Sequence, residues 1–105
     1  MTGPVLDPNA LAKHLEGKQL IDGKLVASKS GETFPVNSPA TGALVANAAA
    51  GNAADVDAAV KSAAIAQVAW AKTPARQRGK LIADCGRLLD AHKEELSRLV
   101  ALETG

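Results

Sequence analysis

The hydrophobic pattern of this chain changes its period at Gly51-Asn52, and this change limits the folds open to it. Before that point, short apolar runs lie between glycine, proline and asparagine, a pattern typical of strands joined by tight turns. After it, apolar residues recur every three or four positions, which predicts helices. Strands followed by a run of helices indicate an α+β fold for these 105 residues.

Two β-hairpins are predicted before the change. Within residues 20–26, Asp22-Gly23 separates apolar flanks and favours a two-residue type I′ turn, in which both central residues need a positive φ. A second pair of strands is expected over residues 33–36 and 44–48, joined by a turn through Pro39 and Gly42. Pro35 has no amide donor, so its strand should lie at a sheet edge or beside a bulge.

A short helix is predicted ahead of the hairpins and two or three longer helices after them. Asn9 or Asp7 could cap the short helix over residues 10–15, which Gly17 would end. Asn52 is the expected N-cap of the first long helix, with the carboxylate of Asp55 three residues on, at the positive end of the helix dipole.

The next helix should begin with Thr73 as its N-cap and Pro74 at its first position. A kink is expected at Gly86 or over residues 90–92. Its apolar positions form a stripe that we expect to be buried, and the residues of this stripe are Leu81, Cys85, Leu88, Leu89, His92, Leu96 and Leu99.

Aromatic side chains are scarce, since Phe34 and Trp70 are the only two. Aromatic residues bury about 150–250 Å² each and normally supply much of a core. Much of the apolar content here is alanine instead, so we expect a shallow core that suits a segment packing against further protein.

Charge and targeting features exclude several classes of partner. The 12 basic and 11 acidic residues give a net charge of +1, so nothing points to nucleic acid or a membrane surface. Arg76, Arg78 and Lys80 are two residues apart and do not share one helix face. A single cysteine excludes an internal disulfide, and the chain has neither a signal-peptide pattern nor a membrane-length apolar run. We therefore expect a cytoplasmic protein.

The titratable side chains do not have the spacing of a catalytic or metal site. His14 and His92 lie far apart, each without a metal-ligand partner at the right spacing. Residues one or two apart on a helix point in different directions, so adjacent carboxylates do not make an acid–base pair. This applies to Asp55 with Asp57 and to Glu94 with Glu95. The sequence also lacks a glycine-rich phosphate loop, so no cofactor site is predicted within it.

Five segments occur in a recognisable order: LIDGKLVAS, NSPATGALV, GNAADVDAAV, TPARQRG and LVALETG. At these spacings the chain resembles the amino-terminal part of the NAD(P)-dependent aldehyde dehydrogenase superfamily, over about residues 20–105. The resemblance divides the chain into an arm with a short helix at residues 1–19 and the first part of an aldehyde dehydrogenase domain at residues 20–105. Because the family continues after its ETG element with Lys-Pro and several hundred residues, we expect a fragment.

The resemblance implies an intact parent with an α/β fold and a Rossmann-like NAD(P)-binding domain. Such a parent would be a homo-oligomer that oxidises an aldehyde to a carboxylic acid with NAD or NADP through a cysteine thiohemiacetal. The fragment would bind no cofactor, have no activity and pack on the remainder of the subunit. The alternative is a self-standing, non-catalytic helical-hairpin module that binds a partner through its alanine-rich helix and leucine stripe.

Two site assignments depend on the resemblance. The family's nucleophile lies far downstream, and Cys85 stands on the apolar stripe where the family usually has an aliphatic side chain, so we expect a buried and unreactive thiol. Some family members bind a structural monovalent cation near positions matching Val36 and Asn37, with help from an acidic residue matching Glu103. The third supporting segment is missing here, so no metal ligand is assigned.

Overall fold

The computed structural model describes residues 7–105, which contain four helices and two two-stranded antiparallel sheets. This confirms the predicted α+β composition, while residues 1–6 of the expected arm lie outside the described part. The elements in chain order are α1 Pro8–Leu15, β1 Lys18–Ile21, β2 Lys24–Ala27, β3 Thr33–Asn37, β4 Leu44–Ala49, α2 Ala53–Lys72, α3 Ala75–Ala91 and α4 Lys93–Thr104.

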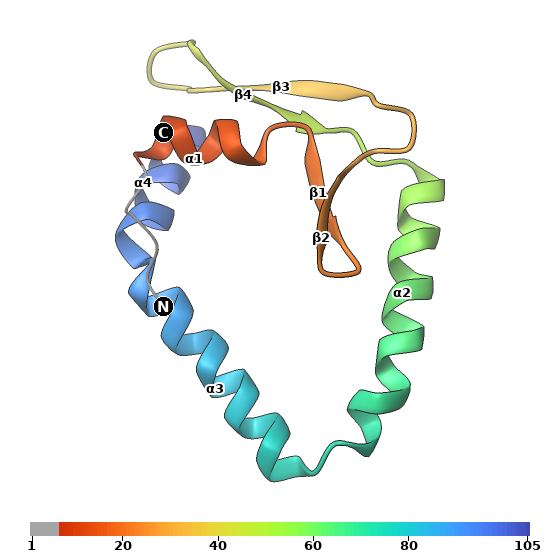
Figure 1. Ribbon diagram of the computed structural model, residues 1–105. Coiled ribbons are helices and arrows are strands. Elements are labelled where there is room, and N and C mark those ends of the chain that lie inside the picture. Colours follow the sequence, from red (N-terminus) through yellow and green to blue (C-terminus); the bar gives the residue numbers. More distant parts are fainter. Residues whose placement is uncertain (1–6) are drawn as a thin grey trace.

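These elements follow one another around an open ring (Figure 1). The helix α1 and the β3–β4 hairpin form one side, α2 runs down the next, and α3 and α4 return to α1, while the β1–β2 hairpin extends inward. The radius of gyration is 16.5 Å, whereas a compact domain of this length has about 13 Å. The chain exposes 7636 Å², against roughly 5,500 Å² for a compact monomer of its mass. It is therefore much more open than a self-contained domain.

The first hairpin has the predicted turn. Ile21 pairs with Lys24, so Asp22 and Gly23 alone form the connection, with φ values of 55° and 70°. Two positive φ angles are the signature of a type I′ turn, whose twist matches that of the flanking strands.

The second hairpin places Pro35 where its missing donor does least harm. Pro35 is opposite Asn47. The backbone of Asn47 faces away from β3, since its N–H donates to Glu16 Oε2 at 2.8 Å and its carbonyl accepts from the N–H of Gly17 at 2.8 Å. Residues directly opposite in an antiparallel pair share this orientation, so the nitrogen of Pro35 faces the free edge. A register shift follows at Val36/Asn37, which confirms the predicted edge position and bulge.

The helix caps follow the sequence at two of three places. Asp7, rather than Asn9, caps α1 by accepting from the N–H groups of Asn9 and Ala10 at 2.9 and 3.0 Å. At α2, Asn52 accepts from the N–H groups of Ala54 and Asp55, and Asp55 accepts from the N–H of Asn52, which forms a reciprocal capping box.

Thr73 is not the N-cap of α3, and that prediction was wrong. Its hydroxyl donates to the carbonyl of Ala69 at 2.9 Å, so it bonds back to the end of α2. Pro74 takes the capping position without a side-chain hydrogen bond. The bond to Ala69 turns the hydroxyl toward α2, where Thr73 is the C-cap.

The break between α3 and α4 falls at His92, whose φ and ψ of −105° and 14° leave the helical region. This confirms the predicted kink over residues 90–92. Gly86 lies inside an uninterrupted α3.

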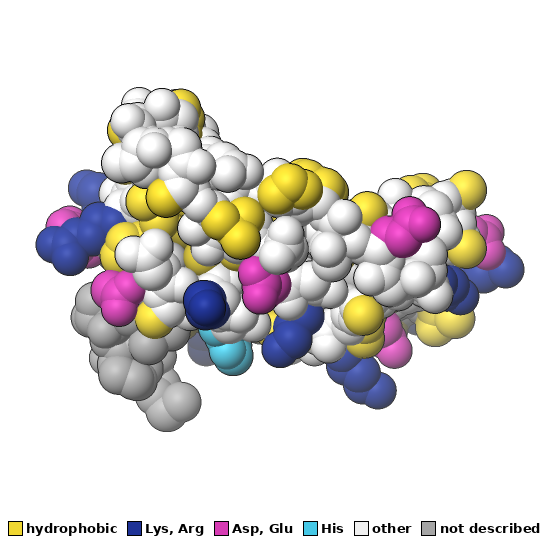
Figure 2. Space-filling view, turned by 90° about the horizontal axis from the view of Figure 1, so that it is seen from above, with side chains coloured by type: hydrophobic (Ala, Val, Ile, Leu, Met, Phe, Trp, Pro, Cys, Tyr) yellow, Lys and Arg dark blue, Asp and Glu magenta, His cyan; other side chains and the backbone are white. Residues whose placement is uncertain are grey.

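The core is small, and the predicted burial of the α3 stripe is wrong. The buried hydrophobic residues within the described part are Ala12 and Val45, where α1 packs on β4 and α4. Leu81, Leu88 and Leu89 are instead 50–63% exposed. Figure 2 shows hydrophobic side chains reaching the surface in several groups between the charged ones. The periodicity correctly predicts an apolar face on α3, but no other described element packs over that face.

Among residues 7–105, no helix combines the length and hydropathy that crossing a bilayer requires.

Two glycine substitutions should change stability in opposite directions. Gly23→Ala should destabilise the fold by about 1 kcal/mol or more, because an L-residue at φ 70° pays the left-handed penalty. Gly86→Ala should raise stability by up to about 1 kcal/mol, since alanine favours a helix interior and nothing lies within 4 Å of the added Cβ. Thermal unfolding followed by far-ultraviolet circular dichroism measures both. A Gly23→Ala chain as stable as the parent sequence would contradict the turn assignment.

Candidate functional site

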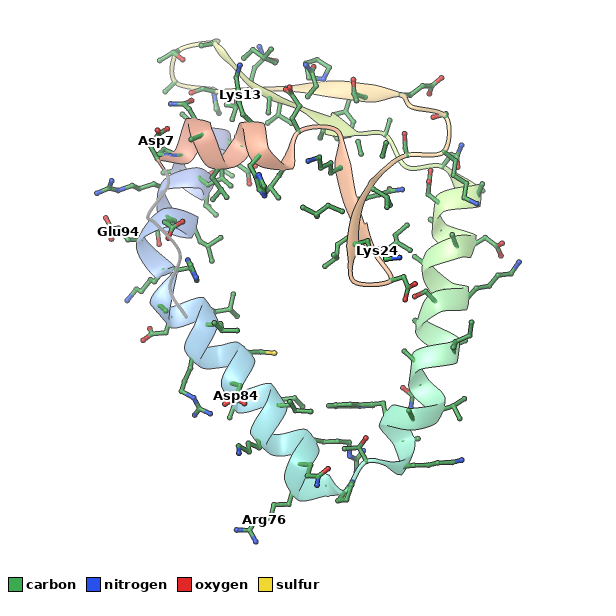
Figure 3. All side chains as sticks on the ribbon, in the orientation of Figure 1. Asp7, Lys13, Lys24, Arg76, Asp84 and Glu94 are labelled. Carbon is green, nitrogen blue, oxygen red and sulfur yellow. The ribbon has the colours of Figure 1, made fainter. Side chains whose placement is uncertain are left out.

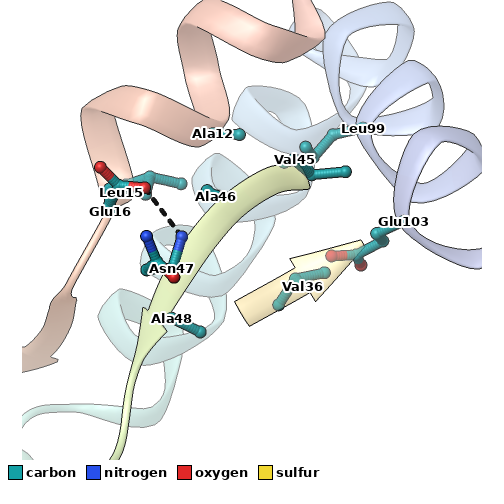
Figure 4. A pocket seen from close by; sticks show the side chains of 10 residues that line it. All are labelled: Ala12, Leu15, Glu16, Val36, Val45, Ala46, Asn47, Ala48, Leu99 and Glu103. Carbon is teal, nitrogen blue, oxygen red and sulfur yellow. Dashed lines mark hydrogen bonds between the residues drawn. The ribbon is translucent and has the colours of Figure 1, made fainter. Parts of the chain in front are cut away.

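A pocket of about 140 Å³ lies where α1, β3, β4 and α4 meet (Figure 4). Most of its wall is aliphatic, and two carboxylates reach its rim. The lining residues are Ala12, Leu15, Glu16, Val36, Val45, Ala46, Asn47, Ala48, Leu99 and Glu103. The pocket brings together the two ends of the described chain, because residues of the first helix, α1, and of the last helix, α4, both line it.

The carboxylate of Glu16 is already used to hold the pocket together. It accepts the outward N–H of Asn47, and the adjacent Gly17 N–H donates to the carbonyl of the same residue. These two bonds attach the end of α1 to the open edge of β4. Glu16 therefore acts as a local substitute for a further strand, which the sequence did not predict because its partner is 31 positions away.

The residues that the resemblance associated with a monovalent cation are partly brought together. Val36 and Glu103 line the same pocket, and Glu103 extends from α4 toward Val36 (Figure 4). The side chain of Asn37 instead donates to the carbonyl of Gly42 at 3.1 Å. Hard cations take about six or more oxygen ligands, and within the described residues no group of three or more His, Cys, Asp or Glu side chains could hold a metal.

The carboxylate of Asp55 accepts three hydrogen bonds, more than any other side chain in the described structure, and Asp55 is only 3% exposed. Its Oδ1 accepts from the Gln19 side-chain amide at 2.8 Å and from the Lys29 N–H at 2.9 Å, and its Oδ2 accepts from the Asn52 N–H at 3.0 Å. The Asn52 bond is the main cause that lowers the pKa of Asp55 from 3.8, and the Lys29 and Gln19 bonds add to it against the opposing effect of burial. Asp55 is thus a structural anion, since its oxygens are occupied by the fold itself.

The two adjacent carboxylate pairs separate as predicted. Asp57 forms a surface ion pair with Lys61 at 3.0 Å, away from Asp55. Glu94 pairs with Arg98 on the surface at 3.1 Å. Neither pair presents two carboxylates to one substrate.

Glu95 was missed as a buried group. It is buried at the start of α4, where its Oε1 lies 2.9 Å from Nδ1 of His92. The signal was available, because residues three apart on a helix face each other. This contact gives His92 a structural role at the break between α3 and α4.

Comparison with known proteins identifies the family of this chain. The profile of the aldehyde dehydrogenase family matches residues 25–105, which is most of the chain. The chain belongs to the aldehyde dehydrogenase family. Its match begins five residues after the predicted start of the resemblance at residue 20.

Several members of the family are similar in sequence. Malonate-semialdehyde dehydrogenase 2 of Geobacillus kaustophilus is 41% identical over 88 residues, which cover 84% of this chain and 18% of the relative. Malonate-semialdehyde dehydrogenase of Halalkalibacterium halodurans is 42% identical with the same coverage. Aldehyde dehydrogenase family 2 member B4, mitochondrial, of Arabidopsis thaliana is 35% identical over 96% of this chain and 19% of its own length. The chain thus spans less than a fifth of these relatives.

In this aldehyde dehydrogenase chain, Cys85 and His14 stand apart from the pocket. Cys85 is exposed on α3, so the expectation of a buried thiol was wrong, for the same reason as for the leucine stripe. His14 is exposed in the last turn of α1, where a basic side chain complements the helix dipole. Cys85, His14 and His92 do not converge within the described residues on a common site.

Removing the charge of Asp55 should weaken the fold and change its response to pH. In Asp55→Asn, the new amide N–H₂ would face either the donor of Asn52 or those of Gln19 and Lys29, so at least one bond is lost. A carboxyl whose pKa falls on folding stabilises the fold above its unfolded value of 3.8, and this stabilisation disappears as the pH falls through the folded-state pKa.

Urea unfolding midpoints between neutral and acid pH provide the measurement. The chain with Asp55 should lose stability in the acid range, whereas Asp55→Asn should start lower and lack that part of the pH dependence. Asp57→Asn is the matched control and should change little, because its ion pair with Lys61 is solvent-exposed. Equal acid sensitivity of the parent sequence and Asp55→Asn would contradict the assigned role.

Proposed function

We propose that this chain is the amino-terminal segment of an aldehyde-oxidising subunit, and that it supports the catalytic machinery without contributing a catalytic, cofactor-binding or metal-binding residue. One observation carries the proposal. A chain that matches less than a fifth of its relatives' length also leaves its apolar helix faces open to water. Such faces need a protein cover.

The area involved is large for a chain of this size. The exposed surface exceeds that of a compact monomer by roughly 2,000 Å², whereas a standard protein complex buries about 800 Å² on each partner. An excess of this size suits a permanent contact inside one subunit, which supports packing on the remainder of the parent.

The parent reaction would oxidise an aldehyde to a carboxylic acid with NAD or NADP, in a subunit whose Rossmann-like domain binds the nucleotide. The residues described here do not fit that cofactor. A helix N-terminus favours a phosphate, but at α2 the side chain of Asn52 already accepts from the N–H groups of Ala54 and Asp55, and the carboxylate of Asp55 accepts from the N–H of Asn52. The buried negative charge of Asp55 would also repel a phosphate. No step of the reaction is therefore assigned to this chain.

The segment should also not select the aldehyde. The similar proteins are named for malonate semialdehyde, benzaldehyde and succinate semialdehyde, although each matches this chain at 37–41% identity. One segment shared by enzymes with such different names is better explained as a scaffold than as a specificity element.

Cytoplasmic localisation and a homo-oligomeric parent complete the proposal. Some relatives are named as mitochondrial, so localisation needs a test of its own. Fluorescence microscopy of the tagged protein and light scattering of the purified parent would test them.

The exposed apolar side chains of α2 and α3 disfavour a self-standing helical-hairpin module. A module should cover most of its apolar surface within the chain, yet Ile65 on α2 is 77% exposed and Leu89 on α3 is 63% exposed.

Activity should require more than residues 1–105. The purified chain should form no reduced nicotinamide with aliphatic or aromatic aldehydes and should bind neither NAD nor NADP in calorimetry, because it lacks the groups for both. The product of any reading frame that continues beyond codon 105 should form reduced nicotinamide, measured by its absorbance. Turnover by the 105-residue chain itself would overturn the proposal.

The chain alone should behave as an uncovered surface. It should bind the dye 8-anilinonaphthalene-1-sulfonate and associate as its concentration rises, because several apolar faces are open. Dye fluorescence and analytical ultracentrifugation measure these properties. A monomer without dye binding and with a sharp cooperative melt would favour the module instead.

A further inference from the structure

The helix α3 has a charged side and a largely apolar side. The direction of the labelled residue Arg76 shows which side faces out of the ring. Arg76 points away from the ring opening (Figure 3). Lys80 and Asp84 follow it at steps of four, and Asp84 forms an ion pair with Arg87. Residues at such spacing share a helix face. The charged face of α3 is therefore the outer one.

Cys85 lies at the centre of the opposite face. It comes nine residues after Arg76, which is roughly two and a half turns and thus the other side of the helix. Leu81, Leu88 and Leu89 are three or four residues from Cys85, so they surround it. We call these four residues the inner face of α3. All four are exposed, and this face is turned toward the opening that α2 and α4 also border.

A second copy of the chain would not cover the apolar surface. On α2, Val60 and Ile65 are 62% and 77% exposed, and five residues of helix place them about 140° apart. A two-fold dimer uses one patch on each copy, so it would leave the other side of α2 and much of the inner face of α3 in water. A larger body that contacts α2 and α3 together covers these faces.

Resting on the proposed function, we propose that the inner face of α3 is the docking surface for the remainder of the same subunit, with Cys85 at its centre. Over these four residues the docking partner presents an apolar surface. Arg78, seven residues before Cys85, lies on the same side of α3. Its Nε is buried without a hydrogen-bond partner among the described residues, so beside Arg78 the docking partner presents an acceptor. The thiol of Cys85 is thereby open to solvent before the subunit assembles and covered afterwards. Cys85 is then a built-in reporter of assembly rather than a catalytic group.

Thiol labelling tests this directly. The 105-residue chain and the product of any reading frame that continues beyond codon 105, called here the longer product, are treated with N-ethylmaleimide for increasing times. After denaturation and trypsin digestion, mass spectrometry of the peptide over residues 81–87 gives the modified fraction of Cys85 without interference from other cysteines. Labelling should be at least about 10-fold slower in the longer product, because exposure limits thiol reactivity. Equal rates would overturn the proposal.

The labelling must also exclude self-association. Over a wide range of protein concentration at constant reagent, the rate in the 105-residue chain should not fall to that of the longer product. A rate that falls with concentration to that of the longer product would assign the inner face to a second copy and overturn the proposal.

Paired substitutions in the longer product separate the two faces. Leu81→Glu and Leu89→Glu should each place a charge in the contact, raise the labelling rate of Cys85 at least about 10-fold and reduce the soluble yield. Leu89→Met should retain slow labelling, because it conserves volume and polarity. Arg76→Glu and Lys80→Glu change the outer face of the same helix and should also retain slow labelling. In Lys80→Glu the peptide to measure is residues 79–87, because trypsin no longer cleaves after residue 80. Slow labelling in Leu81→Glu and Leu89→Glu would overturn the proposal.

The docking surface and the proposed function can fail separately. A longer product that oxidises aldehydes but labels as fast as the 105-residue chain would refute the docking surface alone. A longer product that protects Cys85 but never forms reduced nicotinamide would refute the proposed function and leave the docking contact in place.

Discussion

The carboxylate of Asp55 joins the two halves of this structure. It accepts hydrogen bonds from β1 through Gln19, from the loop after β2 through Lys29, and from the start of its own helix through Asn52. The direction of α2 relative to the first hairpin depends on these bonds, because little else holds the helix in place. Since α3 and α4 continue from α2, the shape of the ring follows from one buried anion that the surrounding backbone keeps ionised.

The remainder of the structure is held at the other end of the ring. There α1 packs on β4 and α4 around Ala12 and Val45, and Glu16 covers the open edge of β4. Between these two contacts, α2 and α3 span the ring with apolar faces in water. Removing apolar surface from water stabilises a protein by roughly 25 cal/mol per Å². Because these faces are exposed here and the family consists of much longer chains, we assign this segment a supporting role.

The sequence predicted best where short-range chemistry decides the result. The Asp22-Gly23 turn, the N-cap Asn52 and the edge position of the strand containing Pro35 were all correctly predicted, because each depends on the backbone preferences of a few neighbouring residues. Thr73 failed as an N-cap, since its hydroxyl is turned toward the carbonyl of Ala69 in α2. The candidate site was predictable only in part. Val36 and Glu103 do meet in one pocket, but the bond of Glu16 to Asn47 spans 31 positions and left no local signal.

The sequence by itself determined the order of strands and helices, the turn types, the apolar face of each helix and the family, because these depend on local periodicity and on motifs in a fixed order. Only the tertiary structure decided whether a face is buried. Leu81, Cys85, Leu88 and Leu89 form the predicted stripe, yet each is exposed. Periodicity reports which side of a helix avoids water, whereas burial requires a second surface at that side, and the described residues place none against α3 there.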